Sequence, residues 1–263
     1  MSLRQTPGVL FLFMLLAPLP APGQDGKPET QPIPQAPAGT ARAPVPSAGR
    51  ESATKRFVLD VWTDQKAIWS SPFRMNRGQL LTIALPVTAV TAGLIATDEE
   101  TARWLPNTPT QIQWSNGIST FGSVYTLGGI VAGGLIVGKA NNKPALFRMG
   151  RNSAEALINT LIVSNALKLA TGRERPDEND GQGRFWKGGH SFPSGHSMNS
   201  WAVAAAVARS PGCPKWLAIT SYSVAAAVSI SRYTAHRHFP SDIFVGSTFG
   251  ILIGKYVATR PRP

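Results

Sequence analysis

Apolar residues in this chain are grouped into long runs, and polar residues are concentrated in short segments between them. The runs are too long for β-strands, and no alternation of apolar and polar positions persists along the chain. The pattern therefore predicts an all-α fold, a six-helix bundle, with a shorter amphipathic helix over 57–69 on its surface. The six helices are predicted over 79–97, 120–139, 153–171, 196–209, 214–233 and 242–259.

Proline, glycine and asparagine mark the connections between these helices, because each of them favours a turn over continued helix. The segments concerned are LPNTPTQ, NNKPALF, RSPGCP and HRHFPS. In a bundle of alternating helices, the connections after the third and the fifth helix lie at the same end. The four histidines of the chain fall in or next to these two connections, at 190, 196, 236 and 238.

The first 55 residues have a different composition from the rest of the chain. Arg4 precedes the apolar stretch GVLFLFMLLA and a patch of proline and small residues, which is the pattern of a secretory signal peptide. A proline-rich stretch follows, and its composition does not bury enough apolar surface to fold. We therefore predict a signal peptide over 1–23, an unstructured linker over 24–55 and one helical domain over 56–263.

The chain carries a formal net charge of +12 at pH 7, which indicates an anionic partner. Nucleic acid is not favoured, because there is no zinc-finger spacing, no basic amphipathic helix and no aromatic–basic RNA-binding motif. An anionic lipid surface or a phosphorylated substrate agrees better with export. Cys213 is the only cysteine, which excludes an intramolecular disulfide and a cysteine-based metal site.

Several predicted helices approach the length of about 20 apolar residues that a membrane span requires. They are rich in alanine, glycine, serine and threonine, however. Basic loops of membrane proteins usually face the cytoplasm. If these helices crossed the membrane after a cleaved signal peptide, their basic loops would face the opposite side. We therefore predict an exported protein of the cell envelope or periplasm, soluble or in contact with the membrane surface. An integral membrane protein with several transmembrane helices is the alternative.

Three short segments carry the candidate chemistry. In KLATGRERP, Lys168 lies in the last turn of the third helix, and Arg175 precedes a proline that keeps its backbone extended. In PSGH, Ser194 is a favoured N-cap, and Gly195 lets the backbone of the first turn approach an anion closely. His196 opens that helix, at the rim of the anion site.

The third segment, SRYTAHRHFPSD, contains Arg232, whose planar guanidinium suits phosphate oxygens. His238 and Asp242 are four residues apart, and a carboxylate on one ring nitrogen leaves the other nitrogen free to attack. Together the segments supply three cations, a helix N-terminus, two histidines and a carboxylate, which phosphoryl transfer without a metal requires. The residues alone do not decide which histidine attacks, although the nearby Asp242 favours His238.

The three segments follow the pattern K-x6-RP, PSGH and SR-x5-H-x3-D. This pattern resembles the signature of the type 2 phosphatidic acid phosphatase superfamily, which includes bacterial acid phosphatases and vanadium haloperoxidases. The resemblance implies a phosphatase that needs no cofactor or metal, with His238 as the nucleophile that forms a phosphohistidine. It implies that Asp242 orients His238 and that His196 is the general acid. The phosphate-binding residues that it implies are Lys168, Arg175, Ser194, Gly195 and Arg232.

The substrate stays open between a lipid phosphate such as phosphatidic acid, an isoprenoid pyrophosphate and a small soluble phosphoester. Two other functions stay open too. One is a vanadium-dependent haloperoxidase that uses the same anion site. The other is a non-catalytic envelope protein that binds phosphate or lipid, against which the presence of both histidines argues. The sequence does not indicate the oligomeric state.

Overall fold

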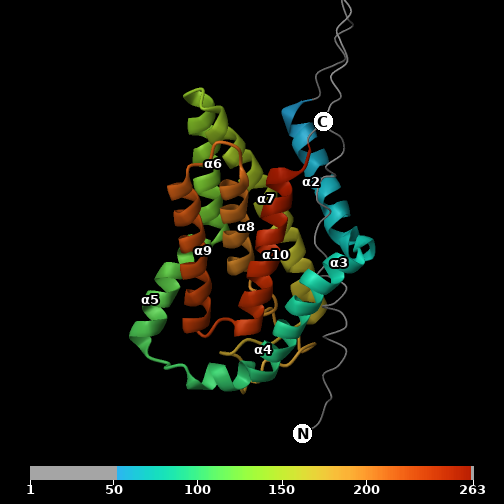
Figure 1. Ribbon diagram of the computed structural model, residues 1–263. Coiled ribbons are helices and arrows are strands. Elements are labelled where there is room, and N and C mark those ends of the chain that lie inside the picture. Colours follow the sequence, from blue (N-terminus) through green and yellow to red (C-terminus); the bar gives the residue numbers. More distant parts are fainter. Residues whose placement is uncertain (1–51, 262–263) are drawn as a thin grey trace, which may run out of the picture.

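The computed structural model describes residues 52–261, so the signal peptide and nearly all of the linker expected from the sequence lie outside the described residues. The described part of the chain is built of helices and contains no strand, which confirms the all-α prediction. Five long helices stand side by side (Figure 1). They are α6 (Val124–Ala140), α7 (Pro144–Thr171), α8 (Gly195–Arg209), α9 (Lys215–Thr234) and α10 (Pro240–Thr259).

Helix α8 lies in the middle of the bundle and packs against α7, α9 and α10. Small residues let α8 and α10 approach closely: a Cβ atom added to Gly254 would come within 2.2 Å of the carbonyl oxygen of Ala202. At the start of α8, a Cβ on Gly246 would lie 2.5 Å from the carbonyl oxygen of Ser194. This close pairing fixes the N-terminal ends of α8 and α10 against each other.

The remaining helices wrap around the bundle. Helix α2 (Ala53–Ser70) lies along one side and begins after Ser52, whose hydroxyl accepts a hydrogen bond from the backbone N–H of Lys55. Helix α4 (Leu85–Trp104) crosses the end of the bundle at which α8 and α10 begin (Figure 1). Short elements connect these helices: η1 (Ser71–Arg74), α3 (Arg77–Gln79), the π-turn η2 (Leu80–Ala84), α5 (Pro109–Ser119) and η3 (Thr120–Gly122).

The prediction of six helices was wrong in number, because Pro109 begins a helix that the sequence analysis did not include, and the start of another helix was placed too late. Pro109 occupies the first turn of α5, and the hydroxyl of Thr108 caps this helix by accepting from the backbone N–H of Gln111. Pro144 likewise begins α7, nine residues before the predicted start. Proline interrupts a helix in its middle but is favoured in its first turn, where its missing N–H has no helical acceptor.

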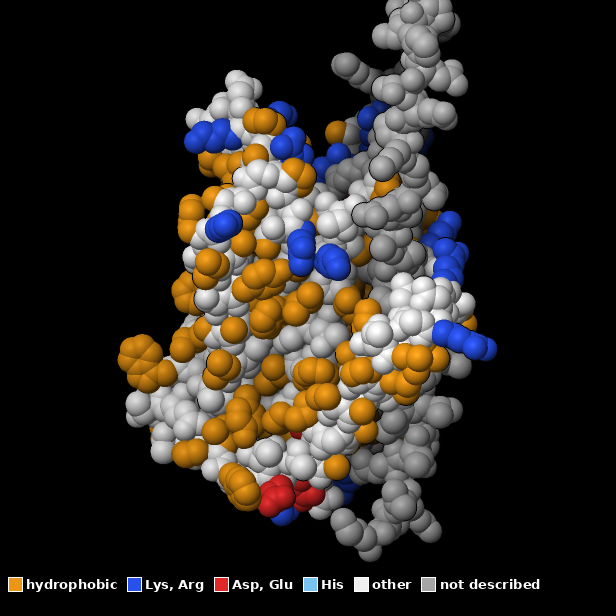
Figure 2. All heavy atoms as spheres, viewed as in Figure 1, with side chains coloured by type: hydrophobic (Ala, Val, Ile, Leu, Met, Phe, Trp, Pro, Cys, Tyr) orange, Lys and Arg blue, Asp and Glu red, His pale blue; other side chains and the backbone are white. Residues whose placement is uncertain are grey.

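Two helical stretches, Arg77–Trp104 and Pro109–Ala140, are long and apolar enough to cross a membrane. Within the apolar 18-residue segment of each stretch, only 17% and 22% of the residues are buried in the bundle, whereas the core helix of a soluble protein is mostly buried. Hydrophobic side chains cover much of the face shown in Figure 2, and lysines and arginines gather at one end of it. Exposed basic residues flank the α6–α7 and α8–α9 connections, far from the start of α8: Lys139, Lys143, Arg148, Arg209 and Lys215.

Candidate active site

The three sequence segments meet at the end of the bundle where α7 ends and where α8 and α10 begin. Gly172 ends α7 in the left-handed conformation (φ 50°), as the sequence predicts for a helix C-terminus. The chain then loops through residues 173–194 to the start of α8 at Gly195. The N–H of Ser194 donates to the carbonyl oxygen of Asp242 (2.9 Å), which joins the second segment to the third. Two helix N-termini therefore point into one site.

His238 and Asp242 face each other, and both side chains are almost fully buried. The Nδ1 atom of His238 lies 3.6 Å from Oδ2 of Asp242. The same carboxylate oxygen accepts from the hydroxyl of Ser191 (2.6 Å) and from the backbone N–H of Phe239 (2.9 Å). This arrangement holds the Nδ1 side of the imidazole toward the carboxylate and leaves Nε2 available for chemistry.

The other oxygen of Asp242 is held by Arg173, a residue that the sequence analysis did not single out. Nη1 of Arg173 lies 2.7 Å from Oδ1 of Asp242, and Nη2 lies 2.8 Å from Oδ2 of Asp98 on α4. The Arg173 side chain is fully buried and stacks on the rings of Phe185 and Phe239, at 4.7 and 4.3 Å from their centroids. Arg173 therefore connects α4 to the His238–Asp242 pair.

Sequence signals for these missed residues exist but are weak. Arg173 lies inside KLATGRERP, between Lys168 and Arg175, which were the two cations predicted to bind phosphate. Asp98 is the first of three consecutive acidic residues near the end of a long apolar helix, and such a charge is expected to be paired when buried. Asp98 accepts from the backbone N–H of Ser241 (3.1 Å) and from its hydroxyl. Only the fold brings residue 98 next to residues 173 and 241.

Burial alone would raise the pKa of Asp242, but the positive charge of Arg173 and hydrogen bonds from His238 and Ser191 lower it to about 2. Burial lowers the pKa of His238 to about 4, although Asp242 opposes this shift. At neutral pH the carboxylate is therefore ionised and the imidazole is neutral, which is the protonation state that a nucleophilic histidine requires.

Lys168, Arg175 and Arg232 surround the start of α8. A Cβ added to Gly195 would lie 3.2 Å from Nζ of Lys168, so the lysine reaches the first residue of the helix. The Nε atoms of Arg175 and Arg232 are buried and have no hydrogen-bond partner among the described residues. Burial, followed by the charges of Arg175 and Arg232, lowers the pKa of Lys168. The cluster thus offers donors and uncompensated positive charge to an anion.

His196 lies in the first turn of α8, within electrostatic range of His238. Burial lowers its pKa to about 3, with further contributions from Arg232, His238, Lys168 and Arg175. Ser194 is the N-cap residue, as predicted, but its hydroxyl makes no capping hydrogen bond within the described part of the chain. It instead accepts from the hydroxyl of Ser197 (3.2 Å). The first-turn N–H groups of α8 are therefore not occupied by this side chain.

The other two histidines lie outside this cluster. Nε2 of His236 lies 3.1 Å from the carbonyl oxygen of Pro106, in the connection between α4 and α5. His190 is exposed and lines a surface hollow together with Arg175 and Lys187. Within residues 52–261, no three His, Cys, Asp or Glu side chains are grouped in a way that would hold a metal ion.

Comparison with known families identifies the part of the chain that forms this site. Residues 151–262 match the model of the PAP2 superfamily, the type 2 phosphatidic acid phosphatases. The matched region contains most of α7, the whole of α8, α9 and α10, and all three sequence segments. The resemblance inferred from the sequence is confirmed.

Curated relatives of this chain carry the name lipid A 1-phosphatase. A lipid A 1-phosphatase of Rhizobium etli is 34% identical over 43% of this chain and 55% of its own length. A lipid A 1-phosphatase of Porphyromonas gingivalis is 35% identical over 35% of this chain and 19% of its own length. The chain thus spans about half, or less, of the length of these curated relatives.

Two solved structures are similar to this chain. One is the transmembrane PAP2-type phosphatidylglycerolphosphate phosphatase of Bacillus subtilis, with 22% identity and a TM-score of 0.49 over 76% of this chain and 92% of that chain. The other is LpxE of Aquifex aeolicus, with 20% identity and a TM-score of 0.45 over 57% of this chain and 87% of that chain.

Proposed function

We propose that this protein is a membrane-associated phosphatase that removes a phosphate group from a lipid, without a metal and through a phosphohistidine. The observation that carries the proposal is the convergence of His238, Asp242 and His196 with three cations at two helix N-termini. The PAP2 match and the lipid A 1-phosphatase relatives support a lipid phosphate as the substrate. Lipid A is the first lipid phosphate to assay.

In the proposed first step, the phosphate lies among Lys168, Arg175 and Arg232, with Ser194 and Gly195 at the start of α8 holding its oxygens. Nε2 of His238 attacks phosphorus while the bond between phosphorus and the lipid oxygen breaks. The cations stabilise the charge on the equatorial oxygens. Because the phosphate is negative, it offsets the cations that lower the pKa of His196, and the ring takes up the proton that it then gives to the leaving oxygen.

In the second step, water attacks the phosphohistidine and the P–N bond breaks. His196 accepts a proton from the water and returns to its starting state after inorganic phosphate leaves. Asp242 keeps the His238 imidazole in one orientation through both steps and stabilises its positive charge.

Association with a membrane is part of the proposal, because a phospholipid substrate is presented by a bilayer. The apolar stretches Arg77–Trp104 and Pro109–Ala140 are the candidates for membrane contact. Export to the cell envelope remains a prediction from the sequence. Alkaline extraction of membranes tests the association: the protein is expected to stay with the lipid fraction, and its full release would contradict this part of the proposal.

The catalytic proposal is tested with para-nitrophenyl phosphate and a lipid monophosphate in mixed micelles, in the presence of EDTA. We expect turnover of both, inhibition by vanadate and a loss of at least about 10³-fold in kcat in His238→Ala. With ³²P-labelled substrate, His196→Ala is expected to accumulate a phosphoprotein that is labile in acid and stable in base. Retained turnover in His238→Ala would overturn the mechanism. Vanadate-dependent halide oxidation would indicate a haloperoxidase instead, and phosphate binding without turnover would indicate a non-catalytic protein.

A further inference from the structure

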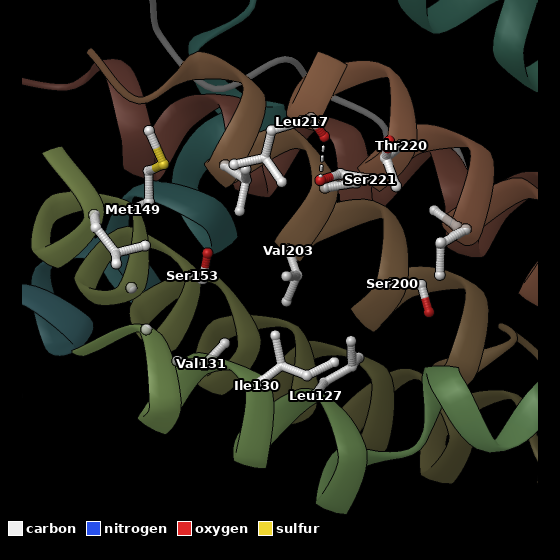
Figure 3. A pocket seen from close by; sticks show the side chains of 17 residues that line it. Leu127, Ile130, Val131, Met149, Ser153, Ser200, Val203, Leu217, Thr220 and Ser221 are labelled. Carbon is white, nitrogen blue, oxygen red and sulfur yellow. Dashed lines mark hydrogen bonds between the residues drawn. The ribbon is translucent and has the colours of Figure 1, made fainter. Parts of the chain in front are cut away.

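An apolar cavity of about 260 Å³ lies beside the proposed active site, between α6, α7, α8 and α9. In Figure 3, Leu127, Ile130 and Val131 of α6 line one wall, and Leu217 of α9 lies on the opposite wall. Val203 of α8 projects between the two walls. None of these side chains takes part in the chemistry proposed above.

The cavity begins close to the anion site and runs away from it along α8. Ser200 lines its near end, one helical turn after His196, and Val207 lines its far end. From His196 to Val207 the helix rises about 16 Å, roughly the length of a dozen methylene groups. An alkyl chain of ordinary length would therefore span the distance from the start of α8 to the far end of the cavity.

The cavity is also open to the side, between α6 and α9. Ile130 on α6 is 60% exposed and Val224 on α9 is 42% exposed, and both line the cavity. Ile130 belongs to the apolar stretch Pro109–Ala140, which is long enough to cross a membrane. With this stretch in contact with a bilayer, as proposed above, the chain of a lipid would enter the cavity without passing through water.

The hydroxyl groups in the walls divide into two kinds. Thr220 and Ser221 donate to carbonyl oxygens of their own helix, at 2.9 and 2.7 Å, so they present an apolar surface. The hydroxyls of Ser153 and Ser200 are buried and have no hydrogen-bond partner among residues 52–261. A buried hydroxyl without a partner is unfavourable. An ester carbonyl near the head of an acyl chain would supply the partner for Ser200.

From these observations, and resting on the proposed function, we propose that this cavity binds an acyl chain of the lipid phosphate substrate. The cationic site at the start of α8 holds the phosphate, and the cavity along the same helix holds the chain. The cavity would therefore determine chain-length preference, since each methylene buried contributes about fourfold to binding.

The test compares two Gly→Leu variants on α6. Gly134 lines the cavity, and a Cβ added there meets no atom closer than 4.0 Å, so Gly134→Leu fills the cavity without a clash at its first atom. Gly129→Leu is the matched control, because Gly129 is exposed and has open space around an added Cβ. Both variants are first checked for the wild-type thermal midpoint and circular dichroism spectrum.

The readout is kcat/KM for lipid monophosphates with chains of 4 to 14 carbons, beside that for para-nitrophenyl phosphate. We expect wild-type and Gly129→Leu protein to show the same rise with chain length. Gly134→Leu is expected to lose at least tenfold on the longest chain, mainly through KM, with the soluble ester unaffected. An unchanged chain-length profile in Gly134→Leu overturns the proposal, and so does an equal loss on both kinds of substrate.

A second measurement separates this proposal from the proposed function. A lipid monophosphate with a photoreactive diazirine near the end of its chain is expected to label α6 or α9 in the wild type and not in Gly134→Leu. Labelling without any turnover would support the acyl-chain site and contradict the proposed phosphatase activity. Labelling that persists in the presence of excess unlabelled lipid monophosphate would assign the cavity to bulk membrane lipid and overturn the proposal.

Discussion

Arg173 shows how one buried side chain organises the proposed active site. Its guanidinium contacts Asp98 and Asp242 at the same time, and its Nε donates to the carbonyl oxygen of Gly183 (3.0 Å). Buried charges are tolerated when each is paired and hydrogen-bonded, and a planar guanidinium has enough donors in fixed directions for both carboxylates. A lysine at this position would not hold the two carboxylates in the same geometry.

We therefore expect Arg173→Lys to lower kcat by about 10²-fold, because the Asp242 carboxylate is no longer fixed against His238. The measurement is steady-state kinetics on para-nitrophenyl phosphate. Arg237→Lys is the control, since its ion pair with Asp177 is partly exposed and such pairs contribute little. A kcat within twofold of the wild type in Arg173→Lys would show that Arg173 does not position the pair.

Protonation of His238 and His196 gives a second prediction at this scale. Their folded-state pKa values are about 4 for His238 and about 3 for His196, below the value of 6.5 for an exposed histidine. The unfolded chain therefore binds more protons between pH 6.5 and pH 4, so the free energy of unfolding falls as the pH is lowered through this range. Each histidine contributes a slope of at most about 1.4 kcal/mol per pH unit.

Denaturant unfolding between pH 7 and pH 4 tests this slope. His238→Gln is expected to reduce it, because the variant lacks the buried imidazole of His238. His190→Gln, at an exposed position, is expected to keep the wild-type slope. The same slope in wild-type and His238→Gln protein would contradict the assignment of His238 to a buried, neutral state.

At the scale of elements, the contact between α7 and the start of α8 depends on a glycine. Gly195→Ala places a Cβ 3.2 Å from Nζ of Lys168, so the ammonium group must shift by a few tenths of an ångström from its position at the start of α8. We expect KM for a soluble phosphoester to rise about tenfold, with the helix itself not weakened because alanine favours helix over glycine. Gly129→Ala is the control, and equal KM values in the two variants would contradict the expected role of Lys168.

The elements also show which sequence signals predicted structure and which did not. Apolar runs predicted the existence of α6 to α10, because a helix must bury an apolar face wherever it packs. The prolines at 109 and 144 were interpreted as breaks, although the same residue is favourable in a first turn. Local sequence does not distinguish these two uses, since the difference is whether the following residues find a surface to pack on.

At the scale of the whole molecule, a second buried charge cluster holds α2 against the end of the bundle opposite the active site. Nε of Arg260, which follows α10, lies 2.7 Å from Oδ1 of Asp64 on α2, and its Nη2 lies 3.2 Å from Oε2 of Glu155 on α7. Burial raises the pKa of Asp64 to about 6, although the charge of Arg260 opposes the shift. Arg260 thus joins three segments that are far apart in the sequence.

We expect Arg260→Met to lower the free energy of unfolding by about 3–5 kcal/mol, because Asp64 and Glu155 would lose the cation that lies between them. Denaturant unfolding at pH 8 measures the change. Arg103→Met is the control, since its ion pair with Glu99 is exposed and contributes about 1 kcal/mol at most. A loss below 1 kcal/mol in Arg260→Met would mean that the cluster does not stabilise the fold.

The sequence by itself determined the helical class, most helix positions and the residues of the proposed phosphate site. Those features depend on local patterns: apolar periodicity, turn residues and three motifs with fixed spacing. The tertiary structure alone decided the partners of these residues. Asp98, Arg173 and Asp242 are brought together by the crossing of α4 at the end of the bundle where α8 and α10 begin, and four successive helices pack together to line the apolar cavity. The physical reason is that burial and pairing depend on side-chain packing between distant segments, which the order of residues along one segment does not record.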